Sequence, residues 1–104
     1  MSEAELTVIR WRDIPAQVVA RAGDGSARAL LPETFQEAVD AAAMVAGLTG
    51  SDDYMTNFQM DRRPCGADLE GEVQAELARL LESWTDEVLR AAIRAGGLRE
   101  QPPA

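Results

Sequence analysis

The stretch from Val8 to Val19, VIRWRDIPAQVV, constrains the fold more than any other part of the sequence. It holds Trp11, one of only two tryptophans, and it has apolar residues on both sides of Pro15. A proline has no N–H to donate to a sheet ladder, and it biases the preceding residue towards an extended backbone. The stretch therefore predicts one strand over residues 6–11, a tight corner, and a second strand over residues 16–22.

A third strand is expected at residues 27–31, because the preceding segment, GDGS, is typical of a hairpin turn. The two-residue period of a strand places Ile9 and Trp11 on one face of the first strand. It places Val8 and the arginines at positions 10 and 12 on the other face. We expect Ile9 and Trp11 to belong to the core.

Beyond Leu31 the apolar spacing changes from two residues to three or four, which predicts helices. Pro32 suits a helix entry and Gly47 a helix end, so a first helix is expected over residues 33–47. A serine followed by two aspartates predicts a second, short helix over residues 51–60.

A polar link is expected at residues 61–66, because it contains three charged residues, a proline and a glycine. Apolar residues then recur at steps of three and four from Leu69 to Ile93 and predict one long helix over residues 68–95. The sequence therefore predicts a single α+β domain over residues 1–98, with a solvated tail at residues 99–104. About three antiparallel strands would be covered by two or three helices. The expected core is Ile9, Trp11, Phe35, Val39, Tyr54, Phe58 and Trp84.

The reactive residue types are few. The chain has ten basic residues, all of them arginine, no histidine and a single cysteine, Cys65. Without histidine or lysine, the commonest general base, the Schiff-base residue and the P-loop lysine are all missing. The nitrogen and sulfur ligands of zinc and iron–sulfur sites are missing within one chain as well. We therefore expect no metal and no cofactor, and a noncatalytic role is favoured over an enzyme that uses carboxylates.

Charge and hydropathy limit the partners. Eighteen acidic residues against ten arginines give a net charge of −8, which repels phosphate backbones and anionic lipid. No apolar run reaches the roughly 20 residues of a membrane span. The first residues are acidic, where a signal peptide would be basic. These observations predict a cytoplasmic protein that binds neither nucleic acid nor membrane.

The charge is divided unevenly along the chain. Residues 1–32 contain four arginines and four acids, so residues 33–104 supply the whole net charge of −8. Two interpretations of the strand arginines remain open: a solvated outer face of the sheet, or a docking face for an acidic partner or an anionic ligand. The side chains that could form such a face are Arg10, Arg12, Gln17, Arg21, Arg28 and Tyr54. The neighbours Arg12 and Asp13 could instead hold the corner of the chain.

The length of the last helix suggests a second contact surface. About 28 residues span about 40 Å at about 1.5 Å per residue, whereas short strands make a sheet about 20 Å long. The apolar stripe on the overhanging part of this helix would then pack against a second copy of the chain or against another partner. Alternatively, the two shorter helices would cover the whole stripe, and the chain would be a monomer. The residues expected at this contact are Leu80, Trp84, Val88 and Ile93, with tryptophan the best anchor.

A family resemblance rests on two runs, WRDIPAQVVA and LPETFQEAVDAAAMVAGLTGSDDYMTNF. They resemble the bacterial "virulence factor" domain family over about residues 6–60. Phe58 departs from the family pattern, which has tryptophan there, and the helix from Asp68 matches no pattern of that family. The matching positions are Trp11 to Val18, Leu31-Pro32, Phe35, Val39-Asp40, Ala43-Met44, Gly47-Leu48 and Asp52-Asp53-Tyr54.

The resemblance implies a small bacterial protein that in some relatives is joined to HEAT-type repeats and to an iron–sulfur scaffold module. Other members are encoded beside enzymes of folate- and cobalamin-linked methyl transfer. An accessory role in a one-carbon or iron–sulfur pathway would follow. We therefore expect a noncatalytic accessory or protein-interaction domain, and the alternative is a binding module for a small anionic ligand through the strand arginines.

Overall fold

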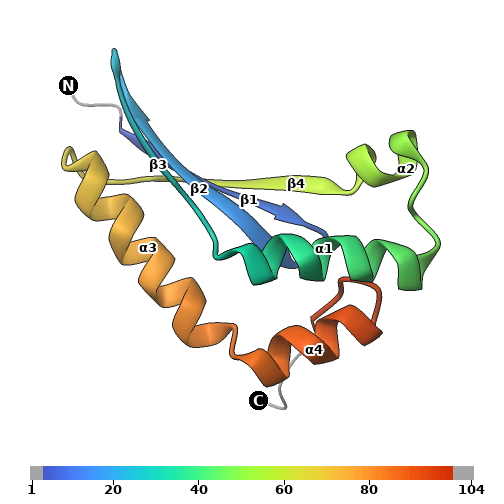
Figure 1. Ribbon diagram of the computed structural model, residues 1–104. Coiled ribbons are helices and arrows are strands. Elements are labelled where there is room, and N and C mark those ends of the chain that lie inside the picture. Colours follow the sequence, from blue (N-terminus) through green and yellow to red (C-terminus); the bar gives the residue numbers. More distant parts are fainter. Residues whose placement is uncertain (1–3, 100–104) are drawn as a thin grey trace.

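The computed structural model describes residues 4–99 and has an α+β fold with a four-stranded antiparallel sheet in the order β3-β2-β1-β4 (Figure 1). The antiparallel sheet and the α+β class were expected from the sequence, and both are confirmed. The number of strands and helices is larger than predicted. The elements are β1 Glu5–Trp11, β2 Ile14–Ala22, β3 Gly25–Leu30, α1 Glu33–Ala46, α2 Ser51–Thr56, β4 Phe58–Pro64, α3 Leu69–Ser83 and α4 Asp86–Arg94.

The fourth strand corrects the prediction of a helix to residue 60 and a polar link after it. α2 ends at Thr56, and β4 then pairs along the whole of β1, from Trp11 against Phe58 to Glu5 against Pro64. The run of charges in β4 is typical of a loop in isolation. In the folded protein each of those charges has an ionic partner on β1 or α3, so tertiary contacts override the local pattern.

The predicted long helix over residues 68–95 is wrong, because α3 ends at Ser83 and α4 begins at Asp86. Thr85 caps α4 through its Oγ1, which accepts a hydrogen bond from the N–H of Val88 at 3.3 Å. The apolar steps of three and four continue across the break, so periodicity alone conceals it. Since the chain turns there, α4 packs against α1, and the predicted overhang does not exist.

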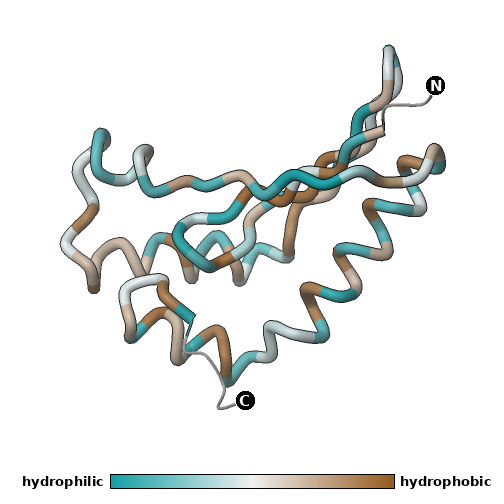
Figure 2. Tube along the Cα trace, turned by 180° about the vertical axis from the view of Figure 1, so that it is seen from behind, coloured by the Kyte–Doolittle hydropathy of each residue, from teal (hydrophilic) through white to brown (hydrophobic). Residues whose placement is uncertain are grey.

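The helices cover only one face of the sheet. α3 packs against β2 and β3, and α1 packs against α4 and the end of β2 (Figure 1). Seen from behind, α3 starts close to the C-terminal end of β4 and then diverges from that strand along its length (Figure 2). Apart from α2, which covers Trp11 at the end of β1, no helix within residues 4–99 lies over the opposite face, which we call the open face.

The core lies between the helices and the covered end of the sheet. Trp11 is fully buried as predicted, together with Leu6, Ile14, Val18 and Val39. Ile9 is a correction, because it lies half-buried on the open face with Thr7 and Val19. Trp11 lies on the same side of β1 as Ile9, but it is at the end of the strand, where α2 covers it. Phe35 and Trp84 are buried as expected, and Tyr54 and Phe58 are half-buried at the margin of the core.

Two consecutive glycines after α4 lie against the buried end of β1. Gly97 has φ +100°, and a Cβ added there would lie 2.7 Å from Cζ3 and 3.1 Å from Cε3 of Trp11. Gly47, at the end of α1, also has positive φ, +73°, but a Cβ there would meet nothing within 4 Å. A side chain at Gly47 therefore introduces backbone strain alone, whereas a side chain at Gly97 introduces both backbone strain and a steric clash with Trp11.

We predict that Gly97→Ala destabilises the protein by about 2–4 kcal/mol, since strain at positive φ adds to overpacking against an immobile indole. Gly47→Ala should cost about 1 kcal/mol, the backbone strain alone. Urea denaturation followed by tryptophan fluorescence and circular dichroism measures both values. Equal losses for the two variants would show that Gly97 does not pack on Trp11 as described.

Candidate functional site: the open face of the sheet

The two charged residues after Trp11 hold the corner of the chain. Arg12 has φ 52°, donates its N–H to the carbonyl of Asn57 at 2.9 Å, and its Nη1 donates to the carbonyl of Gly96 at 3.1 Å. Asp13 donates its N–H to the carbonyl of Gly97, and its Oδ2 accepts a hydrogen bond from the N–H of Arg99 at 2.7 Å. Of the two interpretations of this pair, the geometry supports the corner.

Arg10 lies on the covered face, apart from the other strand arginines. Its Nε donates to Oδ2 of Asp61 at 2.6 Å, and its Nη1 lies 3.5 Å from Oδ1 of Asp13. The hydrogen bond from Arg10 lowers the pKa of Asp61, and the pKa of Arg10 is raised by the same bond. Arg10 and Arg12 are therefore both held by partners within the protein.

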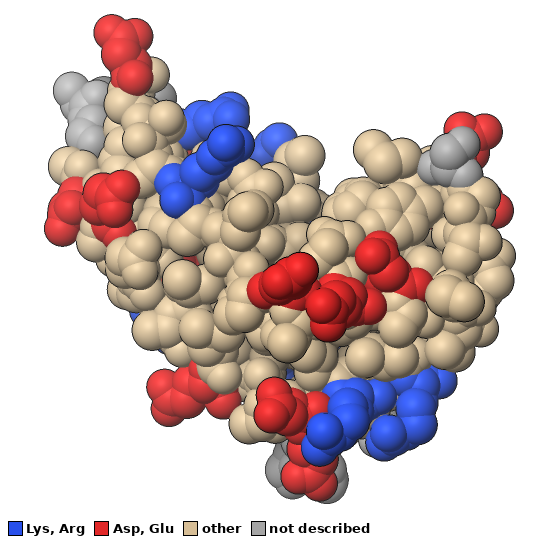
Figure 3. Space-filling view, in the orientation of Figure 1, with Lys and Arg blue, Asp and Glu red and all other residues tan. Residues whose placement is uncertain are grey.

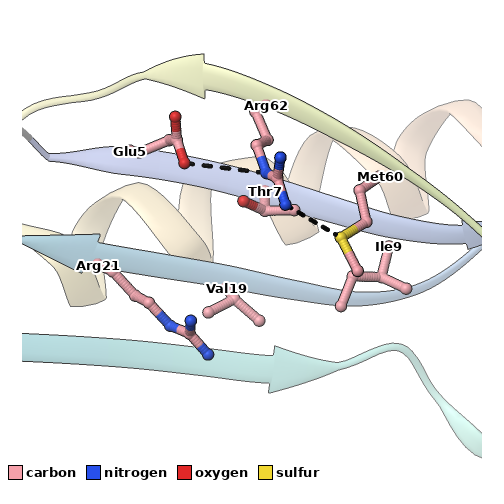
Figure 4. Close-up of a pocket in the computed structure, with 7 residues that line it drawn as sticks. All are labelled: Glu5, Thr7, Ile9, Val19, Arg21, Met60 and Arg62. Carbon is pink, nitrogen blue, oxygen red and sulfur yellow. Dashed lines mark hydrogen bonds and ion pairs between the residues drawn. The ribbon is translucent and has the colours of Figure 1, made fainter.

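The open face consists of three rows of four side chains, one from each strand. The pairing of the strands defines these rows, since residues directly opposite each other share a face. Figure 4 shows seven of the side chains on the face turned away from the helices, which pass behind the strands. In strand order the rows are Leu30, Gln17, Ile9 and Met60; Arg28, Val19, Thr7 and Arg62; and Ser26, Arg21, Glu5 and Pro64.

This face is basic in an acidic protein. It carries Arg21, Arg28 and Arg62 against one acid, Glu5, so its formal charge is 3 − 1 = +2. Nε of Arg62 lies 4.0 Å from Oε1 of Glu5, whereas Arg21 and Arg28 have no ion pair among the described residues. Figure 3 shows basic side chains gathered beside the β2–β3 hairpin, with a second basic group over α4 and acidic side chains between them.

Apolar side chains lie within this basic surface. Leu30 is 71% exposed and Met60 is 57% exposed, and both belong to the same row as half-buried Ile9. Two shallow hollows indent the face. One, of about 240 Å³, lies over β1 and β4, and the other, of about 330 Å³, is lined by Gln17, Arg21, Ser26, Arg28 and Glu70, among others.

The other predicted site residues do not join this face. Tyr54 lies on α2, where its hydroxyl donates to Oδ1 of Asp40 at 3.2 Å and accepts a hydrogen bond from Gln36. Burial and the charge of Asp40 raise the pKa of Tyr54. On the helix side, Trp84 is buried, while Leu80, Val88 and Ile93 are half-buried against the core. Met60 and Arg62 were missed because Met60 was predicted to end a short helix and Arg62 to lie in a polar link.

Beneath the sheet, α3 and β4 are joined by an ionic network. Oε1 of Glu76 accepts hydrogen bonds from Nη2 of Arg63 at 3.0 Å and from Nη2 of Arg79 at 2.7 Å. Burial raises the pKa of Glu76, but the two arginines outweigh it, so the pKa lies below its ordinary value. Glu76 thus fastens the edge strand to the helix.

Several other chemistries find no support in the described part of the chain. Within residues 4–99, no group of three or more carboxylates and cysteines could hold a metal ion. Burial, followed by the neighbouring charge of Glu72, raises the pKa of Cys65 and so disfavours the reactive thiolate. None of the helices combines the length and apolar character that crossing a bilayer requires.

The geometry defines a small α+β domain whose four-stranded antiparallel sheet is covered by helices on one face and carries arginines on the other. The model of the family described as "Virulence factor" matches residues 9–93, and the chain belongs to this family. The match continues through α3 and most of α4, beyond the residues 6–60 on which the sequence resemblance rests. No match was found among the curated proteins or among the solved structures.

We predict that Glu76→Gln lowers the free energy of unfolding by about 1 kcal/mol at neutral pH, because a charged acceptor is replaced by a neutral one. The pKa of Glu76 is lowered in the folded state, so its contribution is present above its unfolded pKa of about 4.3 and is lost as the pH falls through the folded value. The variant should therefore lose less stability than the wild type between neutral and acidic pH. Urea denaturation across that range tests this, with Glu82→Gln, an exposed position of the same helix, as the control. Parallel pH profiles for Glu76→Gln and wild type would contradict it.

Proposed function

We propose that this protein is a noncatalytic interaction domain, and that its open face docks an acidic, partly apolar surface of a protein partner. The observation that supports the proposal most is the combination on one face of three arginines and exposed apolar side chains, in a chain with a net charge of −8. A single-layer sheet with one uncovered face offers a broad surface, unlike the enclosed cleft of most enzymes.

Charge supports both the kind of partner and the way in which it docks. An acidic partner is attracted to the open face and repelled by the acidic side chains of α1 and α3, whereas α4 carries a second, smaller basic group. Complementary charge of this kind accelerates the encounter and suppresses wrong orientations. The docked orientation is thus determined by the distribution of charge.

The apolar side chains support a protein partner over a simple ion. Arginine and methionine are enriched in protein interfaces, and contiguous exposed apolar surface marks interaction sites. Ile9 and Met60 lie side by side in one row of the open face, and Leu30 belongs to the same row beyond Gln17. A partner that covered this row would bury its apolar area, and each Å² removed from water would stabilise the complex by about 25 cal/mol.

A small anionic ligand is the second candidate, supported by the hollow in which Arg21 and Arg28 lie with Gln17 and Ser26. Guanidinium groups and neighbouring amide and hydroxyl groups suit a carboxylate or phosphate. The family resemblance makes folates and cobalamins the first compounds to examine, in line with an accessory role in one-carbon metabolism. A thermal-shift series with folates, cobalamins and nucleotides tests this candidate separately from protein docking.

We predict that Arg21→Glu combined with Arg28→Glu abolishes capture of the protein partner. The matched control, Arg90→Glu combined with Arg94→Glu, changes the net charge by the same amount on α4, away from the open face. Quantitative affinity purification from the source bacterium with wild type and both variants as bait compares them, after circular dichroism shows that all three are folded. The partner that is specific to the open face should be lost at least about tenfold with the first variant and retained with the control.

The partner so identified should then protect the open face from hydrogen exchange when the purified pair is mixed. Equal capture by all three baits would show that the open face is not the docking surface. A shift in melting temperature with a folate or nucleotide that disappears in Arg21→Glu with Arg28→Glu, without protein capture, would favour the ligand-binding alternative.

A further inference from the structure

The free edge of β4 presents unpaired main-chain groups at known positions. Two hydrogen bonds bracket its ladder with β1: the N–H of Cys65 donates to the carbonyl of Ala4 at 3.0 Å, and that of Arg12 donates to the carbonyl of Asn57 at 2.9 Å. In an antiparallel ladder, alternate residues direct both their N–H and C=O groups at the partner strand. The odd-numbered residues of β4 therefore face β1. The N–H and C=O groups of Met60 and Arg62 point outwards, away from the sheet.

A hollow of about 340 Å³ opens beneath this edge, between β4, β1 and α3. Its apolar floor consists of Leu6, Val8, Leu80 and Trp84, and the charged residues Arg10, Asp13, Asp61, Arg62, Arg63 and Glu76 line it as well. It exists because α3 packs against β2 and β3 and diverges from β4, to which Glu76 connects it through Arg63 (Figure 2). The hollow lies next to Asp61, whose side chain is on the covered face of the strand.

Among the described residues, no side chain is hydrogen-bonded to the outward main-chain groups of Met60 and Arg62, although Nη1 of Arg63 donates to the carbonyl of Pro64 at 3.3 Å. Natural edge strands are often protected by charges that project from them. Here the partner of each charge lies on β1 or α3, on the inner side of the strand: Arg10 for Asp61, Glu76 for Arg63 and, at 4.0 Å, Glu5 for Arg62. The edge is thus left accessible to an incoming chain.

We propose that β4 accepts an extended segment of a partner protein as a fifth strand, and that this segment places one apolar side chain in the hollow beneath the edge. The main-chain groups of Met60 and Arg62 would bind the segment, which is the mode of strand addition. The residue opposite Asp61 faces the hollow and is apolar, since Val8 and Leu80 form its floor. The residue opposite Met60 is apolar, and the residue opposite Arg62 is acidic, because Glu5 only partly neutralises that arginine.

Charge favours a partner of this composition over a second copy of the chain. Two antiparallel copies of β4 related by a two-fold axis at Asp61 would pair along all seven residues of the strand. This pairing would place the two Asp61 side chains opposite each other. Pairing about Arg62 opposes two arginines instead, and pairing about Met60, which opposes no like charges, aligns only residues 58–62. Like charges directly opposite each other are destabilising. This inference concerns the edge of the sheet and goes beyond the docking surface proposed above.

The test uses the full chain and a phage-displayed library of random peptides. Binders should share the pattern apolar, apolar, acidic over three consecutive residues, in either chain direction. In the free protein the amides of Met60 and Arg62 should exchange quickly with solvent and those of Asp61 and Arg63 slowly. A bound peptide should slow the exchange of Met60 and Arg62 at least about tenfold, which nuclear magnetic resonance resolves residue by residue.

Two variants separate the main chain from the side chain of Met60. Met60→Pro removes an outward N–H without touching the ladder with β1, and should weaken peptide binding at least about tenfold. Met60→Ala keeps the N–H and should weaken binding less than about threefold. Leu80→Trp fills the hollow and should also weaken binding, and thermal melting confirms that each variant is folded.

The reverse results overturn the inference. It fails if no peptide is selected, or if selected peptides protect amides elsewhere and bind Met60→Pro as tightly as wild type. It also fails if sedimentation shows that the free chain dimerises and that Met60→Pro makes it monomeric, since the edge would then serve a second copy. Loss of partner capture in Arg21→Glu with Arg28→Glu leaves peptide binding at β4 unchanged, so the two proposals are tested apart.

Discussion

Burial of Trp11 at the end of the sheet is the interaction on which the rest of the structure depends. Its indole Nε1–H donates to the carbonyl of Tyr54 at 2.8 Å, and its ring lies against Gly97. The adjacent Arg12 then connects the same corner to Asn57 and Gly96. Segments far apart in the sequence thus meet at one buried tryptophan, which explains how the WRDIP run holds the fold together.

The local sequence predicted the elements whose signals are local. The GDGS turn, the entry of α1 at Pro32 and the stop at Gly47 are present as expected, whereas the corner lies at Arg12-Asp13 and Pro15 is paired within β2. The break at Thr85 also had a local signal, a capping residue followed by two acids, but the continuous apolar period outweighed it. β4 had no such signal, because what stabilises its charges lies on β1 and α3, distant in the sequence.

The candidate site could be predicted only in part for the same reason. The neutral first third of an acidic chain indicated that the strand arginines were worth attention, and Arg21 and Arg28 do lie on an uncovered face. The alternation of side chains along a strand could not show that Arg10 and Arg12 would bind partners within the protein. It also could not show that Arg62 would join the face from another strand. Which face stays open follows from the helices: α4 packs on α1, α1 reaches only the end of β2, and α3 covers β2 and β3 on one side of the sheet.

Met60 and Arg62 belong to two surfaces at once. Their side chains lie on the open face, while their main-chain groups point along the free edge of the sheet. If both proposed contacts form and are coupled through these residues, thermodynamic reciprocity requires each occupant to change the affinity of the other by the same factor. If one acidic group bound at both sites, each occupant would strengthen the binding of the other. If two acidic groups competed for Arg62, each occupant would weaken the binding of the other. Under the two proposals, a single strand would thus link two binding events, cooperatively or as alternatives.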